Sequence, residues 1–160
     1  MKVINSNVID AVIEELENLS DEQYEQHMEN FASAQPVLVA YLFNEENFHL
    51  LTDEEKGFLQ YLALIAWTAI VKTVGNVEAV SEEAIGEAEE KNYAVLEQST
   101  AKKFRDRLDP FFDNYPQEDL LAFAEEAVLE DEDVPEALVS KEGREPIFVA
   151  MKTIIDVLTA

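Results

Sequence analysis

Residues 58–74 of this chain read FLQYLALIAWTAIVKTV, and they are apolar around nearly the whole circumference of a helix. At 3.6 residues per turn, Leu59 and Leu62 lie on one face, while Tyr61 covers another. A helix that is apolar on every side has to be buried on every side. The stretch therefore predicts a central helix, over about residues 53–74, that other helices surround.

The flanks of this stretch indicate where the helix begins and ends. Thr52 is followed by three acidic residues, which is typical of an N-cap and of a first turn that the helix dipole stabilises. Gly75 is typical of a residue that ends a helix. The apolar part lies between Lys56 and Lys72 and is shorter than the roughly 20 residues that span a bilayer. We therefore expect a buried core helix and no insertion into a membrane.

The rest of the chain also follows a helical period, with four glycines and little of the alternation that is typical of strands. One amphipathic helix is expected over residues 82–98. Ser99 is expected to cap the next helix, which is interrupted near Pro110, and Pro146 is expected to begin the last one. The sequence therefore predicts an all-α, single compact domain, residues 1–160, of about seven or eight helices packed around the central one.

Two hexapeptides in distant parts of the chain resemble each other. QPVLVA occupies residues 35–40 and EPIFVA occupies residues 145–150. They are compatible with a helical repeat, and equally with two unrelated helices that each begin with a proline. The sequence leaves both interpretations open.

The charge of the chain limits its partners. There are 35 Asp and Glu residues against 11 Lys and Arg residues, a formal net charge of −24, yet 48% of the residues are hydrophobic. A disordered acidic tail is excluded because enough apolar residues are present to build a core. A surface this negative repels nucleic acids and anionic membranes and favours basic partners. The simpler alternative is that the charge only keeps the protein soluble.

Cysteine is absent from the chain, and the first ten residues lack the features of a secretory signal. The absence of cysteine excludes disulfides, thiolate metal sites and a cysteine nucleophile. It also suits a reducing compartment, so we expect a cytoplasmic protein.

Three short patterns resemble chemical motifs, but each is incomplete. Glu46 and His49 form a single E-x-x-H, whereas a di-iron bundle needs two copies on facing helices. Ser99 and Lys102 fit S-x-x-K, but the companion motifs of the penicillin-recognising enzymes are absent. The run that begins at Asp131 has the acidic spacing of a calcium loop but lacks its glycine. We therefore predict no catalytic residue, no metal site and no cofactor.

A basic cluster is the one local departure from the negative charge. Four of the basic residues fall within six positions and would share helix faces: Lys102, Lys103, Arg105 and Arg107. In so acidic a molecule they are expected to contact an anion, a protein partner or the acidic face of a second copy. The alternative is pairing within the chain, for example with the acidic residues at 106, 109 or 130–133.

Two functional hypotheses follow. The first is a non-catalytic, acidic helical protein–protein interaction domain, for instance an inhibitor or immunity-type binder of a basic partner, or a domain that self-associates. The second is a small-ligand-binding protein or an enzyme whose pocket lies between helices, is lined by Tyr41, Tyr61 and Trp67, and uses buried carboxylates. A cavity of roughly 300 Å³ or more that holds two buried carboxylates would favour the second hypothesis.

Overall fold

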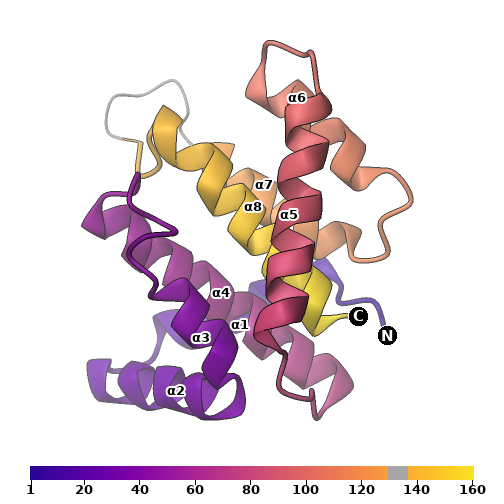
Figure 1. Cartoon of the computed structure of the whole chain (residues 1–160). Coiled ribbons are helices and arrows are strands. Elements are labelled where there is room, and N and C mark those ends of the chain that lie inside the picture. The colour runs from indigo at the N-terminus through magenta and orange to yellow at the C-terminus, as the bar shows by residue number, and fades with distance from the viewer. Residues whose placement is uncertain (130–136) are drawn as a thin grey trace.

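The structure, a computed structural model, describes residues 1–129 and 137–160. Within these residues the chain forms eight α-helices and no strands, in one compact arrangement (Figure 1). The all-α prediction is therefore confirmed. The helices are α1 Ser6–Glu17, α2 Asp21–Ala34, α3 Pro36–Leu42, α4 Asp53–Val74, α5 Glu82–Gln98, α6 Phe104–Phe112, α7 Glu118–Leu129 and α8 Lys141–Leu158.

Helix α4 lies at the centre, as predicted, and packs against α1, α2 and α8. Its middle is buried on several sides, because both Leu59 and Leu64 are fully covered although they lie on different faces. By length and composition alone α4 is the one described helix that could cross a membrane, a test that the core helix of a soluble protein also passes. Burial against three neighbouring helices explains the apolarity of α4 equally well.

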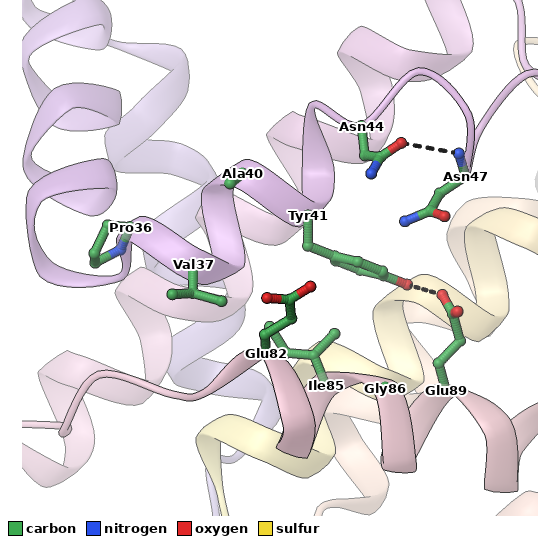
Figure 2. A pocket seen from close by; sticks show the side chains of 10 residues that line it. All are labelled: Pro36, Val37, Ala40, Tyr41, Asn44, Asn47, Glu82, Ile85, Gly86 and Glu89. Atoms are coloured by element: carbon green, nitrogen blue, oxygen red, sulfur yellow. Dashed lines mark hydrogen bonds between the residues drawn. The ribbon is translucent and has the colours of Figure 1, made fainter.

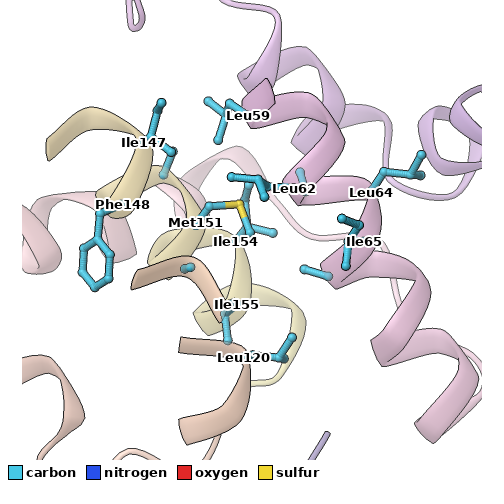
Figure 3. Packing of buried hydrophobic residues seen from close by; sticks show 14 of the residues in the cluster. Leu59, Leu62, Leu64, Ile65, Leu120, Ile147, Phe148, Met151, Ile154 and Ile155 are labelled. Carbon is cyan, nitrogen blue, oxygen red and sulfur yellow. The ribbon is translucent and has the colours of Figure 1, made fainter. Parts of the chain in front are cut away.

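Helix α8 is a second central helix. The sequence pattern indicated only that it is amphipathic and did not predict how completely it is buried. Every residue from 146 to 155 is buried, and α8 packs against α4, α5 and α7. Figure 3 shows side chains of α8, among them Ile147, Met151 and Ile154, facing Leu59 and Leu62 of α4. The core is therefore built around a pair of helices rather than around a single one.

The predicted ends of α4 are confirmed. The Thr52 hydroxyl accepts a hydrogen bond from the backbone N–H of Glu55 at 3.1 Å, and the Thr52 N–H donates to Glu55 Oε1 at 2.9 Å. This reciprocal pair is a capping box. At the other end Gly75 has a φ of 84°, a conformation that a glycine adopts without strain.

Two predicted helix starts are wrong. Helix α8 begins at Lys141 after a Ser140 cap, so Pro146 lies inside it, where it cannot donate the backbone hydrogen bond that another residue would make. Ser99 ends α5 and does not begin α6, which starts at Phe104 and continues through Pro110. Because Pro36 opens α3 whereas Pro146 lies within α8, the two similar hexapeptides occupy different positions in their helices.

Candidate functional site

An open pocket of about 460 Å³ lies between α3 and α5 (Figure 2). Helix α3 and the loop after it form one wall, and a single face of α5 forms the other. We call this hollow the α3–α5 pocket. Its lining residues are Pro36, Val37, Ala40, Tyr41, Asn44, Asn47, Glu82, Ile85, Gly86 and Glu89.

A buried glutamine sets the position of α3 relative to α5. The side chain of Gln35, directly before α3, donates to the carbonyl of Glu78 at 2.8 Å and accepts from the N–H of Val80 at 2.9 Å. Both backbone groups belong to the segment that leads into α5, and the Gln35 side chain is fully buried. A buried amide that satisfies two backbone groups is costly to break, so the two walls of the pocket begin at a fixed separation.

The face of α5 that lines the pocket combines charge, an apolar surface and open space. Glu82, Ile85, Gly86 and Glu89 follow the spacing of one helix face. Ile85 is buried and belongs to the hydrophobic core. A Cβ atom added at Gly86 would meet no atom within 4 Å, so no neighbouring group requires glycine there. A glycine inside a helix costs about 0.5–1 kcal/mol relative to alanine, and its visible effect here is to leave room in the pocket.

Tyr41 holds one of the two carboxylates in place. Its hydroxyl donates to Glu89 Oε2 at 2.5 Å, and its ring packs edge-on against Phe48 with the centroids 5.5 Å apart. Burial, together with the hydrogen bond to Glu89 and its charge, raises the pKa of Tyr41 far above the ordinary value of 10. Tyr41 therefore remains a neutral donor across the physiological pH range, and Glu89 keeps a defined orientation.

The charged side chains that line the pocket are negative. Among the described residues, Glu82 and Glu89 are the only charged ones that line it, and Pro36, Val37 and Ile85 supply apolar surface. Figure 2 shows both glutamates projecting from α5 toward α3, on either side of Gly86. Such a surface can bind a group that has an apolar stem and a cationic head, because each part finds its counterpart.

Two large apolar side chains are exposed in the segment that follows α3. Phe43 and Leu50, both in the connection between α3 and α4, are 52% and 61% exposed. Phe43 immediately precedes the lining residue Asn44. Exposed large apolar side chains are more typical of a protein interface than of a closed small-molecule site.

A second, smaller hollow of about 260 Å³ lies among α1, α4 and α7. Tyr61 lines it, whereas Tyr41 lines the α3–α5 pocket and Trp67 stacks on Phe31 at a centroid distance of 5.4 Å. The three aromatic residues that the sequence grouped in one pocket are therefore not brought together. The hollow is lined by Asp10, Ile13, Glu17, Phe58, Tyr61, Leu62, Ile65, Phe123, Glu126 and Ala127.

The four basic residues singled out in the sequence lie where α5 is connected to α6. Lys102 and Lys103 precede α6 and are exposed, so only Arg105 and Arg107 are helical. Arg107 donates to the carbonyl of Leu96 at 3.1 Å and forms an ion pair of 3.8 Å with Glu145. Arg107 therefore pairs within the chain, with an acid outside the set named from the sequence. Residues 130–133 of that set lie outside the described residues, and the role of the cluster as a partner contact stays a prediction.

Two of the incomplete motifs lie in the part of the chain that the structure describes. His49 is exposed, and its Nδ1 lies 3.0 Å from the carbonyl oxygen of Glu46. Ser99 accepts from the N–H of Ala101 at 3.3 Å. Asp131, in the suggested calcium loop, lies outside the described residues. Among residues 1–129 and 137–160, no group of three or more His, Asp or Glu side chains could hold a metal ion.

A buried polar cluster on α8 was not predicted from the sequence. Lys152 donates to both carboxylate oxygens of Asp156 at 2.8 Å, and Asn92 and Tyr115 donate to the same carboxylate at 3.1 and 2.6 Å. The ammonium group also lies 4.3 Å from the centre of the Tyr115 ring. With these partners the cluster links α5, α8 and the turn before α7, which is a structural role. The spacing of Lys152 and Asp156 within an apolar helix was the available signal.

Comparisons of the chain with protein-family models, with curated proteins and with solved structures gave no match. The functional conclusion therefore depends on the geometry of the α3–α5 pocket and on the charge of the chain.

Proposed function

We propose that this chain is a non-catalytic, acidic helical domain that binds a basic protein partner, and that the α3–α5 pocket is its contact site. The observation that supports this proposal is the lining of the pocket, which joins an apolar surface to Glu82 and Glu89 and, in the part of the chain that the structure describes, contains no basic residue. The net charge of −24 acts in the same direction, because it attracts a basic partner from a distance and accelerates association.

In this proposal the partner is a protein and not a nucleic acid or an anionic membrane, since both of those carry the same sign of charge as this surface. The exposed side chains of Phe43 and Leu50 support a macromolecular partner. A long-range attraction between the two charged surfaces also makes the association rate fall as the salt concentration rises.

The pocket supports an enzymatic function less well. It exceeds the volume of roughly 300 Å³ that a small ligand needs, but Glu89 is only partly buried and Glu82 is exposed. Acid–base catalysis by two carboxylates requires environments that separate their pKa values, usually through burial of one of them. Two glutamates at a solvent-facing rim are better suited to binding a cation than to transferring a proton.

The decisive experiment fills the pocket without changing its charge. In Gly86→Leu a side chain occupies the open space beside α3, whereas Gly57→Leu makes the same change on α4, outside the pocket. The two sites are a matched pair, because both glycines are exposed and a Cβ atom meets nothing within 4 Å at either. Circular dichroism first establishes that both variants keep the helical fold.

The immobilised wild-type chain is then used to select binders from a display library of random peptides. We expect the enriched peptides to be net basic and to carry an apolar residue. Their affinity is expected to fall about tenfold, or roughly 1.4 kcal/mol, in Gly86→Leu and to stay unchanged in Gly57→Leu. Enrichment of neutral or acidic peptides, or equal binding to the two folded variants, would refute the proposed function.

A further inference from the structure

The two glutamates of the α3–α5 pocket have a defined spacing. Glu82 and Glu89 are seven residues apart on α5, which corresponds to about 10.5 Å along the helix axis. Between them lie Ile85 and Gly86. Along α5, the wall of the pocket therefore consists of a carboxylate, an apolar contact, an open space and a second carboxylate, in that order (Figure 2).

A helical segment can match this spacing directly. Residues i and i+7 of a helix lie on one face about 10.5 Å apart, and residues i+3 and i+4 lie between them. In an extended segment the side chains on one face recur about every 6.7 Å, so neither one nor two repeats gives the same separation. Helix-in-groove recognition uses such an i, i+3, i+4, i+7 pattern of contacts.

We propose that the basic partner presents a helix with Lys or Arg at positions i and i+7 and an apolar residue at i+3 or i+4. This inference rests on the proposed function and specifies the partner segment that the same pocket binds. The two basic side chains pair with Glu82 and Glu89, and the apolar side chain enters the space beside Gly86. Tyr41 anchors Glu89, so one of the two ion pairs forms with a carboxylate that is already oriented.

The first test uses two synthetic Ala-rich helical peptides of identical composition. One carries Lys at i and i+7 with Leu at i+4, and the other carries Lys at i and i+5, which lie on different faces, with Leu at the same position. Affinities for the wild-type chain are measured by fluorescence anisotropy at low salt. We expect the i, i+7 peptide to bind about tenfold more tightly than the i, i+5 peptide, and to lose that advantage in the double variant Glu82→Gln, Glu89→Gln.

Different results would refute the spacing rule alone and the proposed function as a whole. If both peptides bind wild type equally well and both bind Gly86→Leu weakly, the spacing rule is refuted while the pocket remains the basic binding site. If neither peptide is affected by Gly86→Leu, the spacing rule and the proposed function are both refuted.

Charge exchange supplies an independent test of the pairing. Glu82→Lys and Glu89→Lys each place a positive charge opposite one peptide lysine and are expected to weaken binding of the i, i+7 peptide about tenfold. A peptide with Glu in place of one lysine should restore binding to one variant, and the peptide with Glu at the other position should restore binding to the other variant. Restoration of both variants by the same peptide, or of neither by any peptide, would overturn the pairing.

Discussion

Glu55 is expected to contribute more to stability than a helix cap normally does, because it joins the starts of both central helices. Its Oε1 accepts from the N–H of Thr52 at 2.9 Å, and its Oε2 accepts from both the N–H and the hydroxyl of Ser140 at 2.9 Å. Ser140 in turn caps α8 by accepting from the N–H of Gly143 at 3.1 Å. Glu55 is 1% exposed, and its carboxylate lies at two helix N-termini.

Glu55→Gln tests this link, because glutamine serves as well as glutamate in an ordinary capping box. The amide has one acceptor oxygen, so its NH₂ group must face a donor, the N–H of either Thr52 or Ser140. One hydrogen bond to a charged group, worth about 1.5–3 kcal/mol, is lost. The negative charge at each helix N-terminus contributes about 0.3–1 kcal/mol more. The expected decrease in the free energy of unfolding is therefore roughly 2–5 kcal/mol.

Urea denaturation at neutral pH measures this decrease. The control is Gln23→Glu, the reverse exchange in the capping box of α2, where Gln23 bonds only its own N-cap Ser20. The control adds one charge at an exposed helix N-terminus, so it should not destabilise the protein and should raise the free energy of unfolding by no more than about 1 kcal/mol. A cost below about 1 kcal/mol for Glu55→Gln would refute the linking role of Glu55.

The pH dependence gives a second readout. Burial raises the pKa of Glu55, but the hydrogen bonds from Thr52 and Ser140 outweigh it, so the pKa lies below its usual 4.5. A carboxyl with a lowered pKa stabilises the fold above that usual value, and this contribution is lost as the pH falls through the folded-state pKa. The stability difference between wild type and Glu55→Gln should therefore shrink below about pH 4.5. A difference that stays constant would contradict the hydrogen-bond assignment.

Gly143, in α8, allows the contact with Glu55 to be tested from the second helix. A Cβ atom at this position would collide with the Glu55 carboxylate, whereas at Gly57 it would meet nothing. We expect Gly143→Ala to destabilise the protein in urea denaturation, while Gly57→Ala stabilises it by about 0.5–1 kcal/mol. In the background of Glu55→Ala the penalty at Gly143 should disappear. A penalty of the same size with and without the carboxylate would show that the two sites do not interact.

The remaining predictions concern the core and the tyrosines. Ala66→Asp should abolish folding, because a fully buried unpaired charge costs several kcal/mol; native helicity in circular dichroism would contradict this. Lys152→Met should cost about 2–3 kcal/mol in urea denaturation because it removes the cation beside Asp156, and a cost below about 1 kcal/mol would show that the pair is dispensable. A pKa above 10 is expected for every tyrosine, that of Tyr93 being raised to about 12 by burial and by the charges of Glu89 and Glu145. The tyrosine hydroxyls of the unfolded chain lose their protons at a lower pH than those of the folded chain, so the stability of the fold should decrease as the pH rises above 10. A titration of the folded protein at 295 nm with its midpoint at pH 10 would contradict this. The tyrosines are Tyr24, Tyr41, Tyr61, Tyr93 and Tyr115.

The part of the fold that could be predicted is the part that local sequence determines. The all-round apolarity of α4, the acids after Thr52 and the glycine at 75 act within one helix, so the pattern located α4 correctly. Helix α8 was placed too late because Pro146 is a common first-turn signal, and the cap at Ser140 depends on a carboxylate 85 positions earlier in the chain.

The α3–α5 pocket depends on contacts that no local pattern contains. Gln35 meets Val80 across 45 positions, and Tyr41 meets Glu89 across 48. Tyr41 was expected to line a pocket together with Tyr61, but Tyr61 lies in another hollow. The available signal was Gly86, a glycine in the middle of a helix face flanked by two acids.

The central claim is that a basic segment binds in the α3–α5 pocket and not over the acidic surface as a whole. Titration of the ¹⁵N-labelled chain with a selected basic peptide, followed by ¹H–¹⁵N correlation spectra, tests this claim most directly. We expect the largest shifts at Tyr41, Glu82, Gly86 and Glu89, and their loss in Gly86→Leu. Shifts spread evenly over the acidic helices, or centred on Tyr61 in the second hollow, would contradict it.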